Sequence, residues 1–355
     1  MKCYELVKHI EKWAPKGVAW QKDNVGLQVG SLNNELKKIV LALELTTKVL
    51  DEAILNDANF IFTHHPFIFT PIKKLNFDDD DNSILIQKLI KHDITLYSAH
   101  TNLDFANNGV SFSLANQLGL TNIKFLSNLK STKKKIVVFV PKNNFDEVSE
   151  ALYSSGAGII GNYSKCSFSL EGEGTFLGDE KTNPSVGTKE KFESVEEIRL
   201  EVIVDEWNLG KAISEMIKAH PYEEPAFDVY SIENENTNFG IGTIGDLPHK
   251  MKQDEFFIYL KEKLKLNNFR YCDGKSELIS RVALCGGSGS ELLSTAMNKE
   301  ADVFVTGDIK YHAFHEAWNK IILIDAGHFE TEIFVLDEMK KFIENIDRKS
   351  TRLNS

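Results

Sequence analysis

The sequence predicts a split α/β domain with a mostly parallel sheet, interrupted by an inserted ferredoxin-like α+β domain. Short apolar strands alternate with amphipathic helices at both ends of the chain, a pattern typical of parallel sheets covered on both faces. Near Lys130 the pattern changes to longer strands and a stretch rich in Gly, Ser and Thr, and the first pattern returns near residue 239. The expected segments are 1–128, 129–236, 237–346 and a short tail at 347–355.

The first segment, residues 1–128, alternates helices and strands. Its helices have apolar residues at helical spacing, and Gly119 is a typical residue at a helix C-terminus. Its strands are short apolar runs. The expected strands are 38–45, 59–64 and 94–100, and the expected helices are 4–13, 47–58, 81–93 and 109–119.

The middle segment, residues 129–236, repeats a strand–helix–strand order, which suits a ferredoxin-like domain. The polar stretch "ENENTN" is interpreted as its exit linker. The expected strands include 134–141, 196–205 and 226–232, with helices at 145–157 and 208–220.

The third segment, residues 237–346, returns to the first pattern, so we interpret the two as one domain in two pieces. Its expected strands are 281–287, 301–307 and 320–327, and its expected helices are 254–266, 289–300, 311–318 and 328–346. The residues at 347–355 differ in character from the last helix, which we expect to end before them. We interpret this tail as a cloning or sequencing artefact.

Composition excludes several classes of protein. The 355 residues carry a net charge of −11, whereas proteins that grip nucleic acid by its phosphates usually present a basic face. No stretch approaches the ~20 apolar residues of a membrane span, and the N-terminus lacks a secretory signal. The four cysteines are scattered without a Cys-x-x-Cys pair. They predict a cytoplasmic protein without a thiolate zinc site.

The motif "THHP" places His64 and His65 directly before Pro66 in an apolar run. Neighbouring side chains of a regular strand point to opposite faces, so both imidazoles face one cavity only if the strand ends here. Pro66 favours such an end. The alternative is one core-facing histidine and one loop histidine.

The motif "SAHTNLDFANNG" follows another expected strand and contains His100 and Asp104. A carboxylate between the apolar Leu103 and Phe105 is costly unless a cation meets it. The alternative is that Asn102 or Asp104 caps the following helix.

The motif "DAGHFETE" places His328 and Glu332 four residues apart, on one face of a helix. Such a pair recurs as ligands in metal sites, although charged residues are also normal in first helical turns. In "VTGDIKYHAFHEA", His312 and His315 are candidate proton shuttles or substrate contacts. Asp308 is as readily an N-cap as a ligand.

Ligands of open α/β sheets gather at the carboxyl ends of strands. Three imidazoles and two carboxylates suit Zn, Mn, Fe, Co or Ni, and a pair of cations uses all five donors economically. The expected metal ligands are His64, His65, Asp104, His328 and Glu332. The loop "DNVGLQVGS" is interpreted as a cleft wall without chemistry of its own.

Five motifs together resemble one protein family: "NVGLQVG", "THHPFIF", "SAHTNLD", "GDIKYHAFHEA" and "DAGHFETE". The chain is similar to the dinuclear-metal-centre hexameric proteins, often named GTP cyclohydrolase 1 type 2 homologues, from about residue 1 to 346. The resemblance implies that the same five ligands hold two metals, with Asp104 as the bridge and His100 as a residue behind the ligands or an occasional ligand. It also implies that the inserted segment, with "AHPYEEPAFDVY", is a PII-like or cation-tolerance-like trimerisation domain of a homohexamer built as a dimer of trimers.

Two functions follow. The first is a metal-dependent hydrolase in which a metal-bridged hydroxide is the nucleophile and His312 or His315 moves protons; the family name suggests a nucleotide such as GTP as substrate. The second is a non-enzymatic metal-binding or protein-interaction ring. Tight, slowly exchanging metals would favour the second function.

Overall fold

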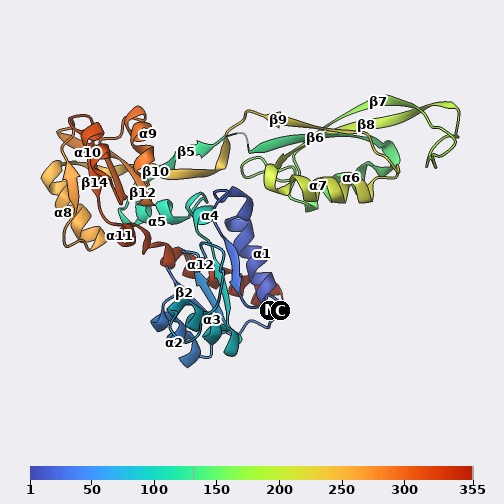
Figure 1. Cartoon of the computed structure of the whole chain (residues 1–355). Coiled ribbons are helices and arrows are strands. Elements are labelled where there is room, and N and C mark those ends of the chain that lie inside the picture. Colours follow the sequence, from blue (N-terminus) through green and yellow to red (C-terminus); the bar gives the residue numbers. More distant parts are fainter. Residues whose placement is uncertain (131, 354–355) are drawn as a thin grey trace. The chain divides into compact units, whose positions relative to one another are not determined.

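The computed structural model describes residues 1–130 and 132–353, with side chains through residue 346 (Figure 1). The chain divides into two units by its internal contacts. Unit 1 comprises residues 1–128 together with residue 239 onward, and unit 2 comprises residues 129–238. None of the helices in the described ranges is both long and apolar enough to span a bilayer.

The N-terminal sheet of unit 1 has four strands in the order β1-β4-β3-β2. Strands β2, β3 and β4 run parallel and β1 runs antiparallel to β4. The elements are α1 (Cys3–Trp13), β1 (Gly26–Val29), β2 (Ile39–Ala42), α2 (Thr47–Leu55), β3 (Phe60–Thr63), α3 (Asp81–Lys91), β4 (Thr95–Ser98), α4 (Thr101–Asp104) and α5 (Val110–Gln117).

Both faces of this sheet are buried, as its apolar strands predict. Phe60 and Phe62 of β3 pack with α1 on one face, whereas Ile61 packs with α2 and α3 on the other. This alternation follows from the two-residue period of a strand. Reactive or ligand-binding side chains are therefore expected at the ends of the strands, and not on the two buried faces of the sheet.

The C-terminal sheet of unit 1 has six strands in the order β11-β14-β13-β12-β10-β5. Strands β12, β13 and β14 run parallel to one another. The elements are β5 (Thr121–Leu129), β10 (Asn236–Lys252), α8 (Gln253–Leu264), β11 (Arg270–Cys272), β12 (Leu278–Ser288), α9 (Leu293–Asn298), β13 (Val303–Gly307), α10 (Tyr311–Ala317), β14 (Ile322–Asp325), α11 (His328–Glu332) and α12 (Val335–Leu353).

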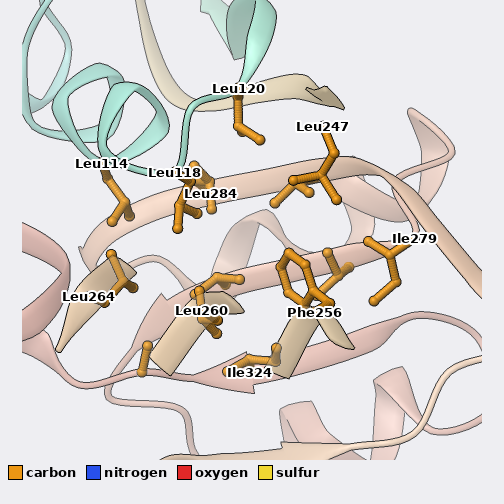
Figure 2. Close-up of a cluster of buried hydrophobic side chains, with 14 of the residues drawn as sticks. Leu114, Leu118, Leu120, Leu247, Phe256, Leu260, Leu264, Ile279, Leu284 and Ile324 are labelled. Atoms are coloured by element: carbon orange, nitrogen blue, oxygen red, sulfur yellow. The ribbon is translucent and has the colours of Figure 1, made fainter. Parts of the chain in front are cut away.

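One face of the C-terminal sheet packs against α8. Figure 2 shows Phe256 and Leu260 of α8 beside Leu284 and Ile324 of the strands. Leu114 of α5 joins the same cluster, although α5 precedes the inserted unit in the chain. The other face is covered by α9 and α10.

The two segments of unit 1 exchange helices. Helix α12 belongs to the C-terminal segment, yet its Val335 and Met339 pack in the core of the N-terminal sheet. Conversely, α5 belongs to the N-terminal segment, but its Leu114 packs in the core of the C-terminal sheet. Residues far apart in the sequence are thereby held together within unit 1, which is what the candidate site requires.

Several sequence predictions need correction. The two segments do not share one sheet, because each builds its own parallel core with an antiparallel strand at one edge, β1 in the first sheet and β11 in the second. Strands β1, β5, β10 and β11, which flank the parallel cores, were not predicted, since their polar and glycine residues weaken the strand pattern.

The C-terminal helix also differs from its prediction. The expected helix 328–346 is broken into α11 and α12. Helix α12 continues through Leu353, because the residues after 346 include no proline or glycine to stop it. The artefactual origin of the tail stays a prediction, and residues 354–355 lie outside the described part.

Unit 2 is a four-stranded antiparallel sheet in the order β7-β8-β6-β9. Its two helices pack on one face, where Val138, Val148 and Met216 belong to one core. The elements are β6 (Lys133–Pro141), α6 (Phe145–Ser154), β7 (Ser167–Leu177), β8 (Phe192–Asp205), α7 (Glu206–Ala219) and β9 (Phe227–Ile232).

Candidate metal centre

The carboxyl end of β3 supplies two neighbouring imidazoles. Strand β3 ends at Thr63, directly before His64. The backbone amides of His64 and His65 still donate to the carbonyls of Ala42 and Leu43, at 3.2 and 2.7 Å. Past the regular strand both rings turn toward one place, with centroids 4.9 Å apart. His64 is completely buried.

The carboxyl end of β4 supplies His100 and Asp104. The His100 ring centroid lies 5.2 Å from that of His64, and Asp104 Oδ1 lies 3.6 Å from His64 Nε2. The capping alternative is wrong for Asn102, whose amide donates to the Ala14 carbonyl. It is wrong for Asp104 as well, because this residue ends α4 and Gly109 is the N-cap of α5.

The turn between β14 and α11 supplies His328 and Glu332. Gly327 adopts φ +93° there, a conformation that favours glycine. Glu332 is buried, and its two oxygens reach different imidazoles: Oε1 lies 3.1 Å from His328 Nε2, and Oε2 lies 3.0 Å from His65 Nε2. His64 Nε2 is 3.7 Å from Glu332 Oε1. One carboxylate thus joins three histidines from two segments of the chain.

Space at the cluster is kept open by Gly287, a buried residue near the end of β12. Its φ is +63°, and a Cβ there would lie 2.2 Å from Glu332 Oε1. The absence of a side chain at Gly287 therefore lets the backbone pass the carboxylate closely.

Each imidazole of the cluster is held at its Nδ1 by an oxygen outside it. His64 Nδ1 pairs with the Ala99 carbonyl at 2.9 Å, His65 Nδ1 with Glu44 at 3.3 Å and His328 Nδ1 with Asp308 at 2.6 Å. Such partners fix the tautomer and leave Nε2 free to bind a metal. This arrangement is typical of metal-ligating histidines.

Among the described residues, three buried atoms of the cluster make no hydrogen bond of acceptable geometry: His64 Nε2, Asp104 Oδ1 and Glu332 Oε2. Each lies only 3.0–3.7 Å from another charged side chain of the cluster. Buried polar atoms are almost always paired, so three unpaired donor atoms in one place need an explanation. A cation would satisfy all three together. The residues present therefore fit a divalent metal.

The electrostatics of the cluster point the same way. Burial raises the pKa of Asp104 to about 6, opposed by the nearby His64. Burial would lower the pKa of His64, but Asp104 and Glu332 outweigh it and raise that pKa to about 9. Burial would raise the pKa of Glu332, but its contacts with His328, His64 and His65 hold it far below its usual range. Without metal, protonated imidazoles supply the positive charge that balances the carboxylates.

In the part of the chain that the structure describes, two overlapping groups of donors are close enough to hold an ion. The first is His64, His65 and His100, and the second is His65, His328 and Glu332. Within each group the donor atoms lie within 4.8 Å of one another. Imidazole and carboxylate donors suit first-row transition metals and zinc.

The histidines of α10 lie apart from this cluster. His312 and His315 are exposed, and His315 Nε2 lies 2.6 Å from the Tyr311 hydroxyl. Among the described residues, no hydrogen bond, ion pair or ring contact joins either imidazole to the five expected ligands. Their role as proton shuttles stays a prediction.

Sequence reasoning missed three supporting residues. Asp308 is neither an N-cap nor a member of the ligand groups, since Lys310 caps α10 and Asp308 accepts from His328. Asp23 lies in the loop interpreted as a plain cleft wall, yet it accepts a hydrogen bond from His100. The third residue is Gly287. The signal that could have found the two carboxylates is weak, because each lies more than 15 positions from its partner in the chain.

Comparisons with known proteins agree over the whole chain. A family model described as Duf34/NIF3 (NGG1p interacting factor 3) matches residues 1–354. A protein of Halalkalibacterium halodurans called "GTP cyclohydrolase 1 type 2 homolog" is 40% identical over 345 residues, 96% of this chain and 92% of that protein. A Bacillus subtilis protein with the same description is 37% identical, and the match covers 98% of this chain and 92% of that protein.

Solved structures show the same likeness. The crystal structure of a Bacillus cereus protein related to NIF3 is similar with a TM-score of 0.81 and 39% identity, covering 99% of this chain and 94% of that one. A Staphylococcus aureus protein gives a TM-score of 0.74 and 31% identity, covering 100% and 93%.

Proposed function

Because this chain belongs to the Duf34/NIF3 family, we propose that it binds two divalent cations in the cluster and uses them as a metal-dependent hydrolase. The proposed ligands are His64, His65, Asp104, His328 and Glu332. The observation that carries the proposal is a set of three buried donor atoms that converge on one place and make no hydrogen bond within the described part of the chain, one each from His64, Asp104 and Glu332.

Two cations, and not one, are supported by the shape of the cluster. The two donor groups share His65 but otherwise use different side chains. Asp104 contacts the first group through His64, and Glu332 contacts members of both groups. Bridging carboxylates of this kind are common in two-metal hydrolytic sites.

The chemistry follows from the charges. When bound, a pair of such cations supplies a water whose pKa is lowered toward ~7 and a Lewis acid for the substrate. Glu332 keeps its negative charge even when buried, so it neutralises cations at neutral pH. The oxygens paired with the three Nδ1 atoms keep His64, His65 and His328 oriented while substrate binds and leaves.

The proposed substrate class is a nucleotide, on the ground of the relatives described as GTP cyclohydrolase 1 type 2 homologues. The reaction in question is hydrolytic opening of the purine ring. The test is to load the protein with Zn, Mn, Fe, Co or Ni in turn and to assay GTP and other nucleotides. We expect turnover that requires metal and disappears in His64→Ala.

A matched control is His9→Ala, because His9 is exposed on α1 and belongs to no candidate site. The hydrolase proposal fails if no nucleotide turns over in protein that carries both metals. Tightly held metals without turnover would instead support a non-enzymatic metal-binding ring.

Unit 2 is proposed to have a ferredoxin-like fold and to join copies of this chain into a homohexamer. Its strand order and its two helices on one face suit that fold. Large apolar side chains are exposed on β7 and β8, including Phe168 and Phe192, at 60% and 68% exposure. Exposed apolar patches mark association surfaces. Light scattering of the wild type and of Phe168→Glu tests this proposal, with a smaller assembly expected for the variant.

A further inference from the structure

Unit 2 contains a cavity of about 620 Å³ that the proposed function does not use. Val138 of β6 and Leu200 of β8 pack in the core between the sheet and its two helices. Because side chains alternate along a strand, the neighbouring Phe139 and Arg199, together with Glu197, point to the opposite face. These three side chains line the cavity, which therefore lies on the face of the sheet without helices (Figure 1). Its volume is typical of a small-molecule site.

The loop between α7 and β9 contributes Tyr222 to the cavity. The buried His220 anchors this loop, because its Nε2 donates to the Phe139 carbonyl at 3.0 Å and its Nδ1 accepts from the Tyr222 amide at 3.1 Å. Burial lowers the pKa of His220, so the ring is neutral and keeps both bonds at neutral pH. The Tyr222 and Phe176 ring centroids lie 6.5 Å apart. The motif "AHPYEEPAFDVY" thus holds an aromatic side chain at the cavity.

Glu197 brings a negative charge to the aromatic part of the cavity. Burial and this neighbouring carboxylate raise the pKa of the Tyr222 phenol. The buried Tyr222 hydroxyl faces Glu197, but in the described part of the chain it makes no hydrogen bond of acceptable geometry. Gly174 makes room for the carboxylate, since a Cβ there would lie 2.1 Å from Glu197 Oε2. The basic side chain of the lining, Arg199, pairs with Glu201 instead, at 3.0 Å.

Two other carboxylates of the lining already have partners. Glu171 pairs with Lys142 at 2.8 Å. Glu223 Oε1 accepts from the amide of Asn183 at 2.9 Å. No ion pair between described residues neutralises Glu197. The cavity thus combines aromatic walls with a carboxylate that lacks a counter-charge, which favours a cationic ligand.

We propose that this cavity binds a small organic amine, whose ammonium group donates to Glu197 and to the Tyr222 hydroxyl while its apolar body packs on the aromatic side chains. An ammonium group has three donors and no acceptor, so it satisfies both oxygens together. Its bond to a carboxylate is charge-assisted, and aromatic faces attract it further. Phe168 and Phe192, proposed above for association, do not line the cavity. The inference is independent of the metal centre proposed for unit 1.

The test is isothermal titration calorimetry of the full-length protein with phenethylamine, which is a cation at neutral pH. Phenethyl alcohol and phenylacetate are probes of similar shape that are neutral and negatively charged. Metal-free protein is used, so that the amine cannot bind a metal. We expect one amine site per chain, with the other two probes bound about tenfold more weakly or less tightly still.

Two variants of the lining assign the binding to this cavity. Glu197→Gln keeps the shape of the side chain but removes its charge, so amine affinity should fall by about 10–100-fold. Tyr222→Leu removes the ring and the hydroxyl and should cost about 2–30-fold. Glu147→Gln is the matched control, because Glu147 is exposed on α6, on the other face of the sheet, and it should keep the wild-type affinity. Melting curves report folding, and Tyr222→Phe tests the hydroxyl alone if Tyr222→Leu melts early.

The inference is overturned if the wild type does not bind phenethylamine at millimolar concentrations, or if the alcohol or phenylacetate binds as tightly as the amine. It is equally overturned if a folded Glu197→Gln variant binds the amine with wild-type affinity. None of these outcomes bears on the metal centre, which has its own test.

Discussion

Helices α10 and α11 offer a comparison within one sheet. They follow the neighbouring parallel strands β13 and β14, and each carries a pair of candidate site residues about one turn apart: proton shuttles on α10 and metal ligands on α11. His312 and His315 of α10 are exposed. His328 and Glu332 of α11 instead meet His64 and His65 from the other segment.

The difference lies in what surrounds each pair. His328 has a carboxylate at its Nδ1, and Glu332 has Gly287 at its side. His315 has a tyrosine hydroxyl in the same helix. The spacing of two residues on a helix thus does not identify a ligand pair. Two features are more informative about a candidate metal ligand: a partner that fixes the histidine tautomer, and a neighbouring segment that leaves space beside the carboxylate.

The largest expected effect comes from Glu332→Gln. This change keeps the shape of the side chain but removes the charge that lies within 3.0–3.7 Å of three imidazoles. Both equivalents of metal should be lost after dialysis, as measured by elemental analysis. The matched control on α10 is Glu316→Gln, at an exposed position, and it should keep both equivalents. Equal metal content in the two variants would break the comparison.

Gly287→Ala should have the next largest effect. Its Cβ would overlap Glu332 Oε1, and its backbone at φ +63° disfavours any side chain by about 1–2 kcal/mol. We expect weaker metal binding and a lower melting temperature. Gly210→Ala is the control, because a Cβ there meets no atom within 4 Å. Unchanged metal affinity in Gly287→Ala would show that the glycine does not shape the site.

A moderate effect is expected for Asp308→Asn. His328 loses the carboxylate at its Nδ1, so metal affinity should fall by about 10–100-fold. His315→Ala, on the neighbouring helix, should leave the affinity unchanged. A chelator competition distinguishes them, and a wild-type affinity in Asp308→Asn would remove the support for its role.

The effect of pH is the smallest and the most general. In the metal-free cluster the pKa values of His64 and His328 are raised to about 9, because of Asp104 and Glu332 near the former and of Glu332 and Asp308 bonded to the latter. A metal must displace these protons, so binding should release protons and strengthen from pH 6 toward pH 9. Calorimetry in two buffers of different ionisation enthalpy measures the release. Binding that weakens as pH rises would contradict the assignment.

The sequence was enough to identify the five candidate ligands that lie together in the structure, because each follows an apolar strand and stands out against it. His64 and His65 before Pro66 are the clearest case. The supporting carboxylates were not predictable, since Asp23 and Asp308 lie in ordinary loop sequence and gain meaning only from three-dimensional contacts. The two-sheet architecture was missed for a related reason: strand order depends on pairing, which apolar periodicity does not encode.

The central claim is that side chains from three places in the chain bind two cations in one buried cluster. Anomalous diffraction from crystals of the metal-loaded protein tests it most directly. The account predicts two peaks per chain, bounded by His64, His65, Asp104, His328 and Glu332. Crystals of protein that carries its full metal content, with no anomalous peak among these five side chains, would contradict it.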